Sequence, residues 1–435
     1  MSARMEAEKT LWWATANPAP QTAPLAQNLS VDVAVIGGGF TGLTAAWHLA
    51  RRGVRVVVLE ASALGMEASG LNAGFVVPNF AKAPPEAVIG KFGAERGERL
   101  LRMIGQGADR VFETVRQNGI SCDAEQNGWM HVAHSRAALD RLAGQAAAWQ
   151  KLGRPVHMLD AGEAKRRTGL RLCAGALIDR SGGMLHPLNY LYGLAGLVLG
   201  AGGIVHTHSP AERIEPAGSS SKIIVGGHTV TAGKVLMCTH AGSLGAARPL
   251  SRVSVPLFVY QIATEPLPQE VVERFSPDRN PIADTRANLF TYRLDRDNRL
   301  ISGAMAMIPF GAHQRMARMV VERLARELDL ASVPKVDFVW RGRAAMAPDF
   351  LPHLYQMQPG VIGAVGCNGR GVALTAMLGE VLADAACGTP LSDLPVPSGP
   401  LRPIPFHALV PVVSSLAIGQ ARFADRKLTA SRSAE

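Results

Sequence analysis

A glycine-rich turn between an apolar run and an amphipathic stretch constrains this chain most strongly. Residues 31–37, before the turn, are short, apolar and β-branched, which is typical of a strand buried on both faces of a parallel sheet. Residues 41–53 have helical spacing and end at a glycine, which indicates a glycine-capped helix. Residues 54–61 form a second apolar run. The sequence therefore predicts a βαβ unit.

The glycines of this turn satisfy the GxGxxG spacing, and each has a separate task. Gly37 allows the tight turn, Gly39 lets the backbone approach a pyrophosphate, and Gly42 lets helix and strand pack together. Glu60 ends the second predicted strand, 18 residues after Gly42. A carboxylate at this place suits a free ribose hydroxyl, because a 2′-phosphate on the ribose would repel the carboxylate. We therefore predict a dinucleotide site; the structural alternative is a plain glycine turn with a surface glutamate.

Length and composition favour an ordered enzyme of two or three domains. The 435 residues are 47% apolar and include 45 glycines, which argues against disorder. The net charge of +10 comes from scattered arginines without a lysine block, so we predict no nucleic-acid partner.

Cysteine and histidine spacing predicts neither disulfides nor a metal site. The five cysteines are odd in number and lack a CxxC, and the twelve histidines show no HExxH. The N-terminus lacks the apolar core of a secretory signal, and no window approaches about 20 apolar residues. We expect a cytoplasmic protein.

The segment after Glu60 distinguishes FAD from NAD as the bound dinucleotide. Residues 64–75, LGMEASGLNAGF, are small, polar and glycine-rich, where a nicotinamide enzyme would return to a plain βα pattern. Here the sequence resembles the FAD-dependent amine and amino-acid oxidases of the D-amino-acid oxidase family, nearest the γ-glutamylputrescine oxidoreductase and sarcosine oxidase-like branch. That branch has GASGRNGG at this place; this chain departs from it at Leu71 and Ala73, which puts in doubt the polar contact of the replaced arginine.

The resemblance extends over about 350 residues. It continues through IDRSGGMLHP, KVLMCTHAGS, WRGRAAMAPDFLPHL and GCNGRGVALT. It implies an α/β fold in which a Rossmann-type FAD-binding domain is interrupted by an α+β substrate domain with a large mixed antiparallel sheet. The expected segments are 31–84, 168–243 and 341–395 for the FAD-binding domain, 85–167 and 244–340 for the substrate domain, 1–30 for an extended leader and 396–435 for a C-terminal extension.

Two glycine turns are predicted to bind FAD. Besides the first turn, Gly366, Gly369 and Gly371 leave backbone N–H groups free at the start of a helix, where they would stabilise negative charge on a reduced flavin; an ordinary strand–turn–helix is the alternative. The predicted cofactor-binding residues are Gly37, Gly39, Phe40, Thr41, Gly42, Glu60, Ala61, Ser69, Asn72, Gly74, Phe75, Gly366, Asn368, Gly369, Arg370, Gly371 and Val372.

The resemblance implies oxidation of a C–N bond in a small amine or amino acid, with a secondary amine or polyamine derivative favoured. Hydride would pass to flavin N5, and the resulting imine would hydrolyse. Some relatives attach FAD through a cysteine after the WRG-like segment, which has none here, so we expect non-covalent FAD. The acceptor is O₂ or a quinone or electron carrier; no lysine lies between Lys234 and Lys335 to activate oxygen as in some relatives.

Four residues are the predicted substrate or catalytic contacts. Tyr260, Tyr292 and Arg293 lie on expected strands of the substrate domain, and His353 resembles a position near the flavin. Core packing of the tyrosines, a surface ion pair of Arg293 and a buried, satisfied His353 are the alternatives.

Two other functions fit the same fold. One is a flavin-dependent 2-hydroxy-acid or polyol dehydrogenase, and the other is a flavin-binding subunit of a larger complex. The basic C-terminal residues Arg422, Arg426, Lys427 and Arg432 suggest contact with a membrane surface, although a solvated tail is the usual case.

Overall fold

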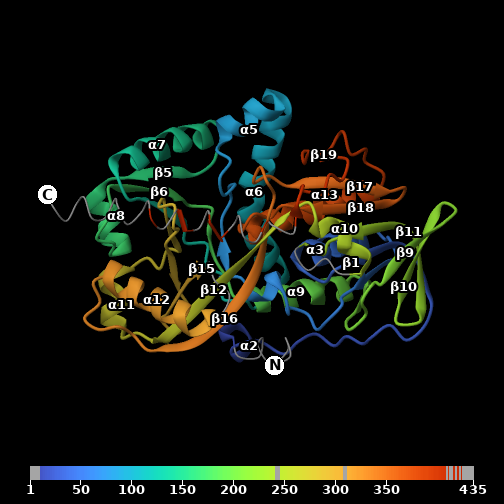
Figure 1. The fold of residues 1–435 in the computed structure, drawn as a ribbon, viewed down its shortest axis with the longest axis horizontal. Coiled ribbons are helices and arrows are strands. Elements are labelled where there is room, and N and C mark those ends of the chain that lie inside the picture. The colour runs from blue at the N-terminus through green and yellow to red at the C-terminus, as the bar shows by residue number, and fades with distance from the viewer. Residues whose placement is uncertain are drawn as a thin grey trace.

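The computed structural model describes residues 10–240, 245–306 and 311–407, with residues 410, 415, 416, 419, 420 and 423 of the C-terminal segment. Two large sheets form the framework of the molecule, one on each side of Figure 1. The basic C-terminal residues named above lie outside the described residues, so the structure does not address their membrane contact.

The first sheet has a parallel centre. Strands β18, β11, β1, β2 and β8 run parallel, and β17, β10 and β9 add antiparallel pairs. Strands β2 and β18 and the last four residues of β1 are apolar and buried, as expected for parallel strands covered on both faces. In order, the sheet contains β19 (Ser398–Gly399), β17 (His353–Gln358), β18 (Val361–Val365), β11 (His228–Met237), β1 (Leu29–Ile36), β2 (Val56–Leu59) and β8 (Ile204–His206), with β10 (Ser220–Val225) and β9 (Arg213–Ala217) beside β11.

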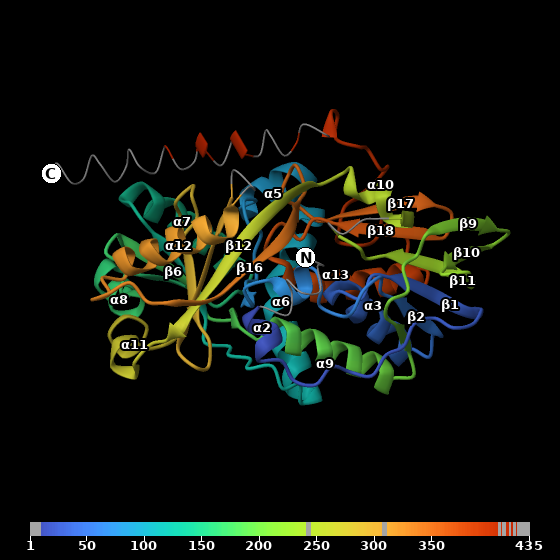
Figure 2. The same cartoon turned by 60° about the horizontal axis from the view of Figure 1, so that its bottom comes forward.

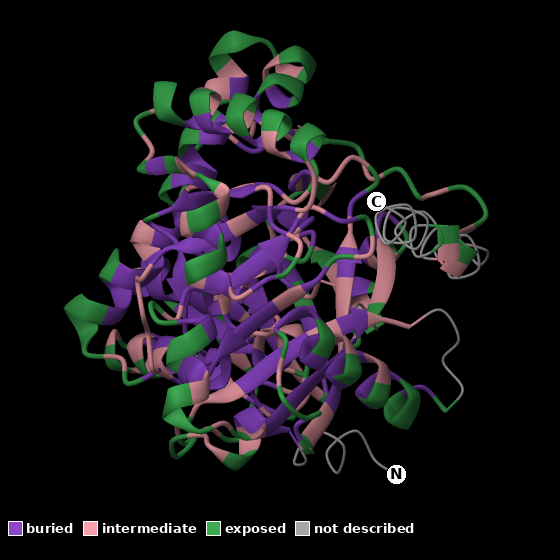
Figure 3. Cartoon of the chain, turned by 90° about the vertical axis from the view of Figure 1, so that its left-hand side faces the viewer, coloured by how far each residue is buried: buried purple, intermediate pink, exposed green. Residues whose placement is uncertain are grey.

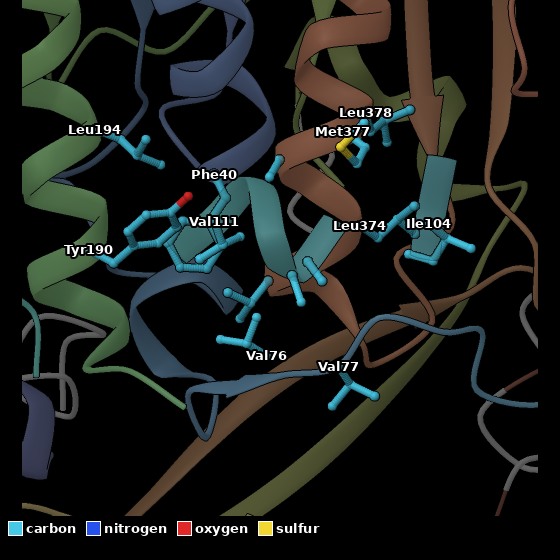
Figure 4. Packing of buried hydrophobic residues seen from close by; sticks show 14 of the residues in the cluster. Phe40, Val76, Val77, Ile104, Val111, Tyr190, Leu194, Leu374, Met377 and Leu378 are labelled. Carbon is cyan, nitrogen blue, oxygen red and sulfur yellow. The ribbon is translucent and has the colours of Figure 1, made fainter. Parts of the chain in front are cut away.

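One layer of helices packs together beside this sheet. It contains α3 (Phe40–Arg51), α13 (Gly371–Ala386), α6 (Ala94–Asn118) and α9 (Pro187–Gly200). Helices α3 and α13 approach so closely that a Cβ on Gly379 would lie 2.6 Å from Thr44 Cβ. Figure 4 shows apolar side chains of these helices, Phe40 and Tyr190 among them, meeting in one core. The starts of α3 and α13 are thereby held near each other.

The second sheet is mixed and mostly antiparallel. Its order is β16 (Val336–Met346), β12 (Val255–Pro266), β15 (Arg299–Met305), β14 (Thr291–Leu294), β13 (Ile282–Asp284), β4 (Trp129–Ala133), β6 (Gly175–Asp179) and β5 (Val156–Leu159). The long strands β12 and β16 run obliquely across Figure 2. Strand β6 belongs to this sheet although residues 168–243 were assigned to the FAD-binding domain, and β16 crosses the boundary at residue 340. The domain limits stay predictions.

The two faces of the second sheet meet different cores, because successive side chains on a strand point to opposite faces. Residues such as Ile262 and Leu300 pack with α12 (Ala312–Glu327), whereas Ala263 and Ile301 join the core of the first sheet. We call the latter the front face. Figure 3 shows buried strands enclosed by helices whose outer faces are exposed.

The remaining helices and strands complete the fold. They are α2 (Leu11–Ala14), α4 (Ala68–Leu71), α5 (Pro85–Phe92), α7 (Arg136–Lys151), α8 (Ala161–Thr168), η1 (Gly245–Ala247), α10 (Arg248–Ser251), α11 (Gln269–Phe275), and a two-stranded sheet of β3 (Phe75–Val76) and β7 (Gly183–Met184). The leader is not wholly extended, since α2 buries Trp12 in the core. The predicted fold class, α/β with a Rossmann-type domain and a large mixed sheet, is confirmed.

Candidate cofactor and active site

The first glycine turn connects β1 to α3 and leaves no space for side chains at two positions. Gly37 has a φ of +106°, and a Cβ there would lie 2.7 Å from the carbonyl oxygen of Cys238. A Cβ on Gly42 would lie 2.0 Å from the carbonyl oxygen of Gly37. The turn therefore depends on both glycines for the close approach of strand and helix.

Gly39 differs, because a Cβ there would contact only the Ser69 side chain, 2.9 Å from its hydroxyl oxygen. Gly39 is the N-cap of α3 without a side-chain cap, and the Phe40 N–H donates to Ser69 Oγ at 3.1 Å. Gly39 and Thr41 are partly exposed. A Cβ on Gly39 would meet no protein backbone beyond its chain neighbours within 4 Å, so the positive end of this twelve-residue helix has room for a pyrophosphate.

Glu60 follows β2 and is tied to the same turn. Its carboxylate accepts hydrogen bonds from the backbone N–H groups of Gly38 at 2.8 Å and Ser62 at 3.0 Å. Burial raises the pKa of the Glu60 carboxyl against the lowering effect of these bonds. A carboxylate fixed beside the turn is the arrangement that ribose binding requires, so these residues fit the dinucleotide half of FAD.

The loop from 64 to 75 is held in place from several directions. Asn72 Nδ2 donates to the carbonyls of Ala68 and Ser69, and its Oδ1 accepts from Gly74 N–H at 2.8 Å. Trp12 Nε1 donates to the Asn72 carbonyl. These contacts fix the backbone of the loop. Asn72 and Gly74 therefore determine the shape of the loop that is predicted to contact the cofactor.

Two side chains of the second sheet also hold this loop. Trp340 Nε1 donates to the Leu71 carbonyl at 3.0 Å. Arg293 Nη1 donates to the carbonyl oxygens of Leu185 at 2.7 Å and Ala73 and Gly74 at 3.2 Å. Burial lowers the pKa of Arg293 to about 10. Arg293 thus joins the loop to the substrate sheet.

The second glycine turn connects β18 to α13. Gly366 and Gly369 have φ values of +99° and +77°, and Asn368 also has a positive φ. Asn368 Oδ1 accepts from Ala347 N–H at 2.7 Å, and its Nδ2 donates to the Gly366 carbonyl at 2.8 Å. Gly369 is exposed. Predicted residue Val372 is buried in the core, so its contribution to the site is the backbone of the first helical turn.

The two turns lie at the same edge of the first sheet. Strands β1, β11 and β18 are parallel neighbours, so the loops after their carboxyl ends adjoin. A ligand crossing from Gly39 to Gly369 passes the end of β11, and the crevice outside the carboxyl ends of parallel strands is where such sheets bind ligands. We call this edge the cofactor crevice.

The predicted substrate tyrosines lie on the face of the second sheet that points away from the first. Tyr260 is buried against His313 of α12, with ring centroids 5.4 Å apart. Tyr292 is fully buried, and its hydroxyl donates to the Thr168 carbonyl. The substrate role of both residues stays a prediction, and both side chains lie on the opposite face of the sheet from that of Arg293.

His353 is placed in a surface ion cluster. Its Nε2 lies 2.9 Å from Asp349 Oδ1, and Lys91 pairs with the same carboxylate. Burial alone would raise the pKa of Asp349, but bonds from His353 and Lys91 hold it well below its usual range. His353 opposes Val365 at the end of β18, near the second turn.

The front face contains polar residues that the sequence analysis missed. The rings of His131 and Trp129 lie 5.1 Å apart, and burial, helped by Arg370, lowers the pKa of His131 to about 3. Gln261 is 7% exposed, and its buried Oε1 has no hydrogen-bond partner among the described residues. Strand alternation would have grouped Trp129 with His131, but no local pattern indicates which face meets the cofactor domain.

Arg370 links this face to the second turn. Its guanidinium lies over the Trp129 ring at 5.0 Å, and Nη1 donates to the Phe80 carbonyl at 3.0 Å. Burial lowers the pKa of Arg370 to about 10. Among the described residues, no carboxylate forms an ion pair with it. A partly buried cation without an anionic partner among the described residues suits a ligand with negative charge.

Within the part of the chain described by the structure, no group of three His, Cys, Asp or Glu residues is arranged to hold a metal ion. The same residues include no helix of sufficient length and apolarity to cross a membrane.

Comparison with known proteins decides the family. Residues 32–385 match the family described as FAD dependent oxidoreductase (DAO). The chain belongs to this family. Its members bind FAD, so FAD is the cofactor, and the residues of both turns fit it as described above. The predicted family, enzyme class and cofactor are confirmed.

Several relatives of this FAD-dependent family align over most of the chain. Gamma-glutamylputrescine oxidoreductase of Escherichia coli is 29% identical over 91% of this chain and 95% of its own length. Glycine oxidase of Geobacillus kaustophilus is 25% identical over 81% of this chain and 92% of its length. The structure of L-proline dehydrogenase from P. horikoshii has a TM-score of 0.72 at 17% identity, covering 85% of this chain and 96% of that one, which supports the fold.

Proposed function

We propose that this FAD-dependent oxidoreductase oxidises the C–N bond of a small amine or amino acid, with a secondary amine or polyamine derivative as the favoured substrate. The product would be an imine that hydrolyses to a carbonyl compound and an amine or ammonia. The proposal is supported by the relatives, whose names specify γ-glutamylputrescine and glycine as substrates. When bound, FAD supplies the hydride acceptor.

The observation that supports the proposal most directly is the polar group on the front face, next to the second glycine turn. Gln261 lies on the same face but on β12, with β15, β14 and β13 between it and β4. The group therefore consists of His131 on β4 and Arg370, whose guanidinium lies over the Trp129 ring beside His131. We propose that this group binds and orients the substrate amine.

His131 would stay neutral at the pH of the cell, because its pKa is held near 3. Its Nε2 lies 3.2 Å from the Asp284 carbonyl, which favours a proton on Nε2 and leaves Nδ1 as the acceptor nitrogen. A neutral acceptor suits an amine that must lose its proton before oxidation. Arg370 and the N–H groups of α13 would stabilise negative charge on the reduced cofactor.

Anaerobic flavin bleaching tests the proposal. Purified protein with FAD would be mixed with secondary amines, polyamine derivatives, D- and L-amino acids and 2-hydroxy acids. We expect an amine to remove the absorbance near 450 nm, and a His131→Gln variant to do so more slowly at equal cofactor content. Bleaching by hydroxy acids alone, or by no compound, would refute C–N oxidation and favour the dehydrogenase or the binding-subunit alternative.

The same cuvette separates the electron acceptors. Rapid return of the oxidised spectrum in air would indicate an oxidase, and slow return with fast reoxidation by a quinone would indicate a dehydrogenase. We propose slow reaction with O₂, because no lysine occurs between Lys234 and Lys335, the range that includes strands β12 to β15 of the second sheet.

A further inference from the structure

A cysteine and a histidine meet in the cofactor crevice although no step of the proposed oxidation uses them. Cys367 follows β18 and His240 follows β11, and Cys367 Sγ lies 3.2 Å from His240 Nε2. The two strands are parallel partners, with Met237 opposite Gly363, so their carboxyl ends place both residues at one edge. Both side chains are partly exposed.

The position of this pair coincides with the expected path of the cofactor. His240 lies two residues after Cys238, whose carbonyl oxygen a Cβ on Gly37 would contact. Cys367 belongs to the second glycine turn, and a Cβ on Gly371 would lie 3.6 Å from its Sγ. The pair therefore lies between the two FAD-binding turns.

The surroundings favour the ionised form of the sulfur. Burial alone would raise the pKa of the Cys367 thiol, but the His240 imidazole and the backbone N–H of Gly369 outweigh burial, and the pKa is lowered. For His240, burial opposes the charged form and Cys367 favours it, and the pKa is raised. The other charged groups near the imidazole are Arg343, which lowers its pKa, and Glu67, which raises it.

His240 Nε2 also accepts a hydrogen bond from the Ala345 N–H at 3.1 Å. The single lone pair of His240 Nε2 therefore faces two donors, the Ala345 N–H and the Cys367 S–H, while the sulfur keeps its proton. When the sulfur reacts, its proton moves to Nε2, the hydrogen bond from the Ala345 N–H is lost, and the Gly369 N–H remains to stabilise the anion. This is the arrangement of a nucleophile with an adjacent base.

The other cysteines provide the contrast. Burial raises the pKa of Cys122 and Cys238 to about 12, and it also raises that of Cys173, so these thiols are protonated and inert. Cys387 is exposed at the end of α13, far along the helix from the crevice.

We propose that Cys367, with His240 as its base, is a site of covalent modification by soft electrophiles, including hydrogen peroxide, when FAD is absent, and that the modified sulfur blocks FAD binding. With peroxide, the sulfur attacks one oxygen and the O–O bond breaks. Cys367 is oxidised to a sulfenic acid, and the departing hydroxide takes the proton from His240 and leaves as water. The inference depends on the placement of FAD in the crevice, not on the amine substrate.

Alkylation of the full-length FAD-free chain by iodoacetamide between pH 5 and 9 tests this site. Peptide mass mapping gives separate rates for Cys367 and Cys387, so Cys387 is an internal reference in every sample. We expect the Cys367 rate to level off at lower pH than the Cys387 rate. In a His240→Gln variant we expect the pH at which the Cys367 rate levels off to rise by about one unit. Below that pH, alkylation of Cys367 should then be about tenfold slower than in the wild-type chain. Equal inflections in the wild-type chain would overturn the proposal even if the variant does not fold.

Protection of Cys367 by bound FAD is the second test of the proposal. Saturating FAD should slow alkylation of Cys367 at least tenfold and leave Cys387 unchanged, and chain treated with peroxide should take up less FAD than untreated chain. A Cys367→Ser variant should bind FAD and keep that binding after peroxide. If FAD binds but does not protect Cys367, the inference fails while the proposed oxidation stands. If the untreated chain takes up no FAD at all, the inference and the proposed function both fail.

Discussion

Trp12 Nε1 donates a hydrogen bond of 2.8 Å to the carbonyl oxygen of Asn72, so a residue of the leader holds the loop from 64 to 75 that follows β2. The Trp12 ring also packs edge-on against His186 at 4.9 Å and against Trp340 at 5.9 Å. Arg293 lies over the same ring at 5.5 Å. The indole of Trp12 therefore connects the leader to the loop and to the second sheet.

Trp12→Phe should weaken FAD binding, because it removes the bond to Asn72 while keeping an aromatic ring. The loss of one hydrogen bond costs about 0.5–1.5 kcal/mol, which corresponds to a rise of about two- to tenfold in the Kd for FAD. Titration of the apoprotein by flavin fluorescence measures it. Trp13→Phe is the matched control, since Trp13 Nε1 has no hydrogen-bond partner among the described residues. Equal Kd values for the two variants would contradict the role of Trp12.

The glycines of the first turn should separate folding from binding. Gly39→Ala places a methyl group against only the Ser69 side chain, so the chain should fold and FAD affinity should fall at least tenfold. Gly42→Ala forces the Gly37 carbonyl to move and should reduce folded protein itself. Gly90→Ala in α5 has open space and should affect neither property. Circular dichroism and FAD titration together measure this, and normal FAD affinity in Gly39→Ala would contradict the assignment.

The cofactor half of the site was predictable from sequence because its signals are local. The buried ends of β1 and β18 are apolar, and the glycines that follow these strands are needed for backbone shape, so the pattern is visible within about 30 residues. The role of Trp12 was not predictable in this way. Its partner Asn72 lies 60 residues away, and the Pro-rich composition of the leader gives no indication of a buried indole.

The substrate half was only partly predictable. Tyr292 and Arg293 were expected on one strand, and both lie on β14. Adjacent residues of a strand point to opposite faces, however, so Tyr292 packs with the outer helices while Arg293 reaches the loop from 64 to 75. Which face meets the cofactor domain is decided by long-range pairing of sheets. His131 and Gln261 could not be identified before that pairing was known.

Acid should destabilise the folded chain partly through His186. Burial, reinforced by the nearby Arg293, lowers the pKa of His186 to about 3, so the folded state binds fewer protons than the unfolded state between pH 6.5 and 3. Stability is therefore lost as the pH falls through that window. His186→Asn keeps a side chain able to cap α9, where His186 Nδ1 accepts from Asn189 N–H.

Between pH 6.5 and 4.5 the wild type should lose about 2 kcal/mol more free energy of unfolding than His186→Asn. Thermal or urea unfolding at several pH values measures this difference. His157→Asn, at an exposed position, is the control and should follow the wild-type slope. Parallel slopes for wild type and His186→Asn would show that His186 does not contribute to acid sensitivity.

A buried ion cluster behind the second sheet should contribute more to stability than any exposed pair. Arg286 pairs with Asp284 and lies 2.8 Å from Glu327, and all three side chains are less than 10% exposed. Arg286→Met leaves two buried carboxylates unpaired, which should cost about 3–5 kcal/mol of the free energy of unfolding.

Removal of the whole cluster distinguishes a charge effect from a packing effect. The triple variant Arg286→Met, Asp284→Asn, Glu327→Gln should recover part of the stability lost in Arg286→Met, because no buried charge is then unpaired. Arg136→Ala, whose partner Asp140 is 61% exposed, should change stability by less than about 1 kcal/mol. If Arg286→Met loses no more than this exposed control in urea unfolding, solvent reaches the cluster and its burial does not determine its energy.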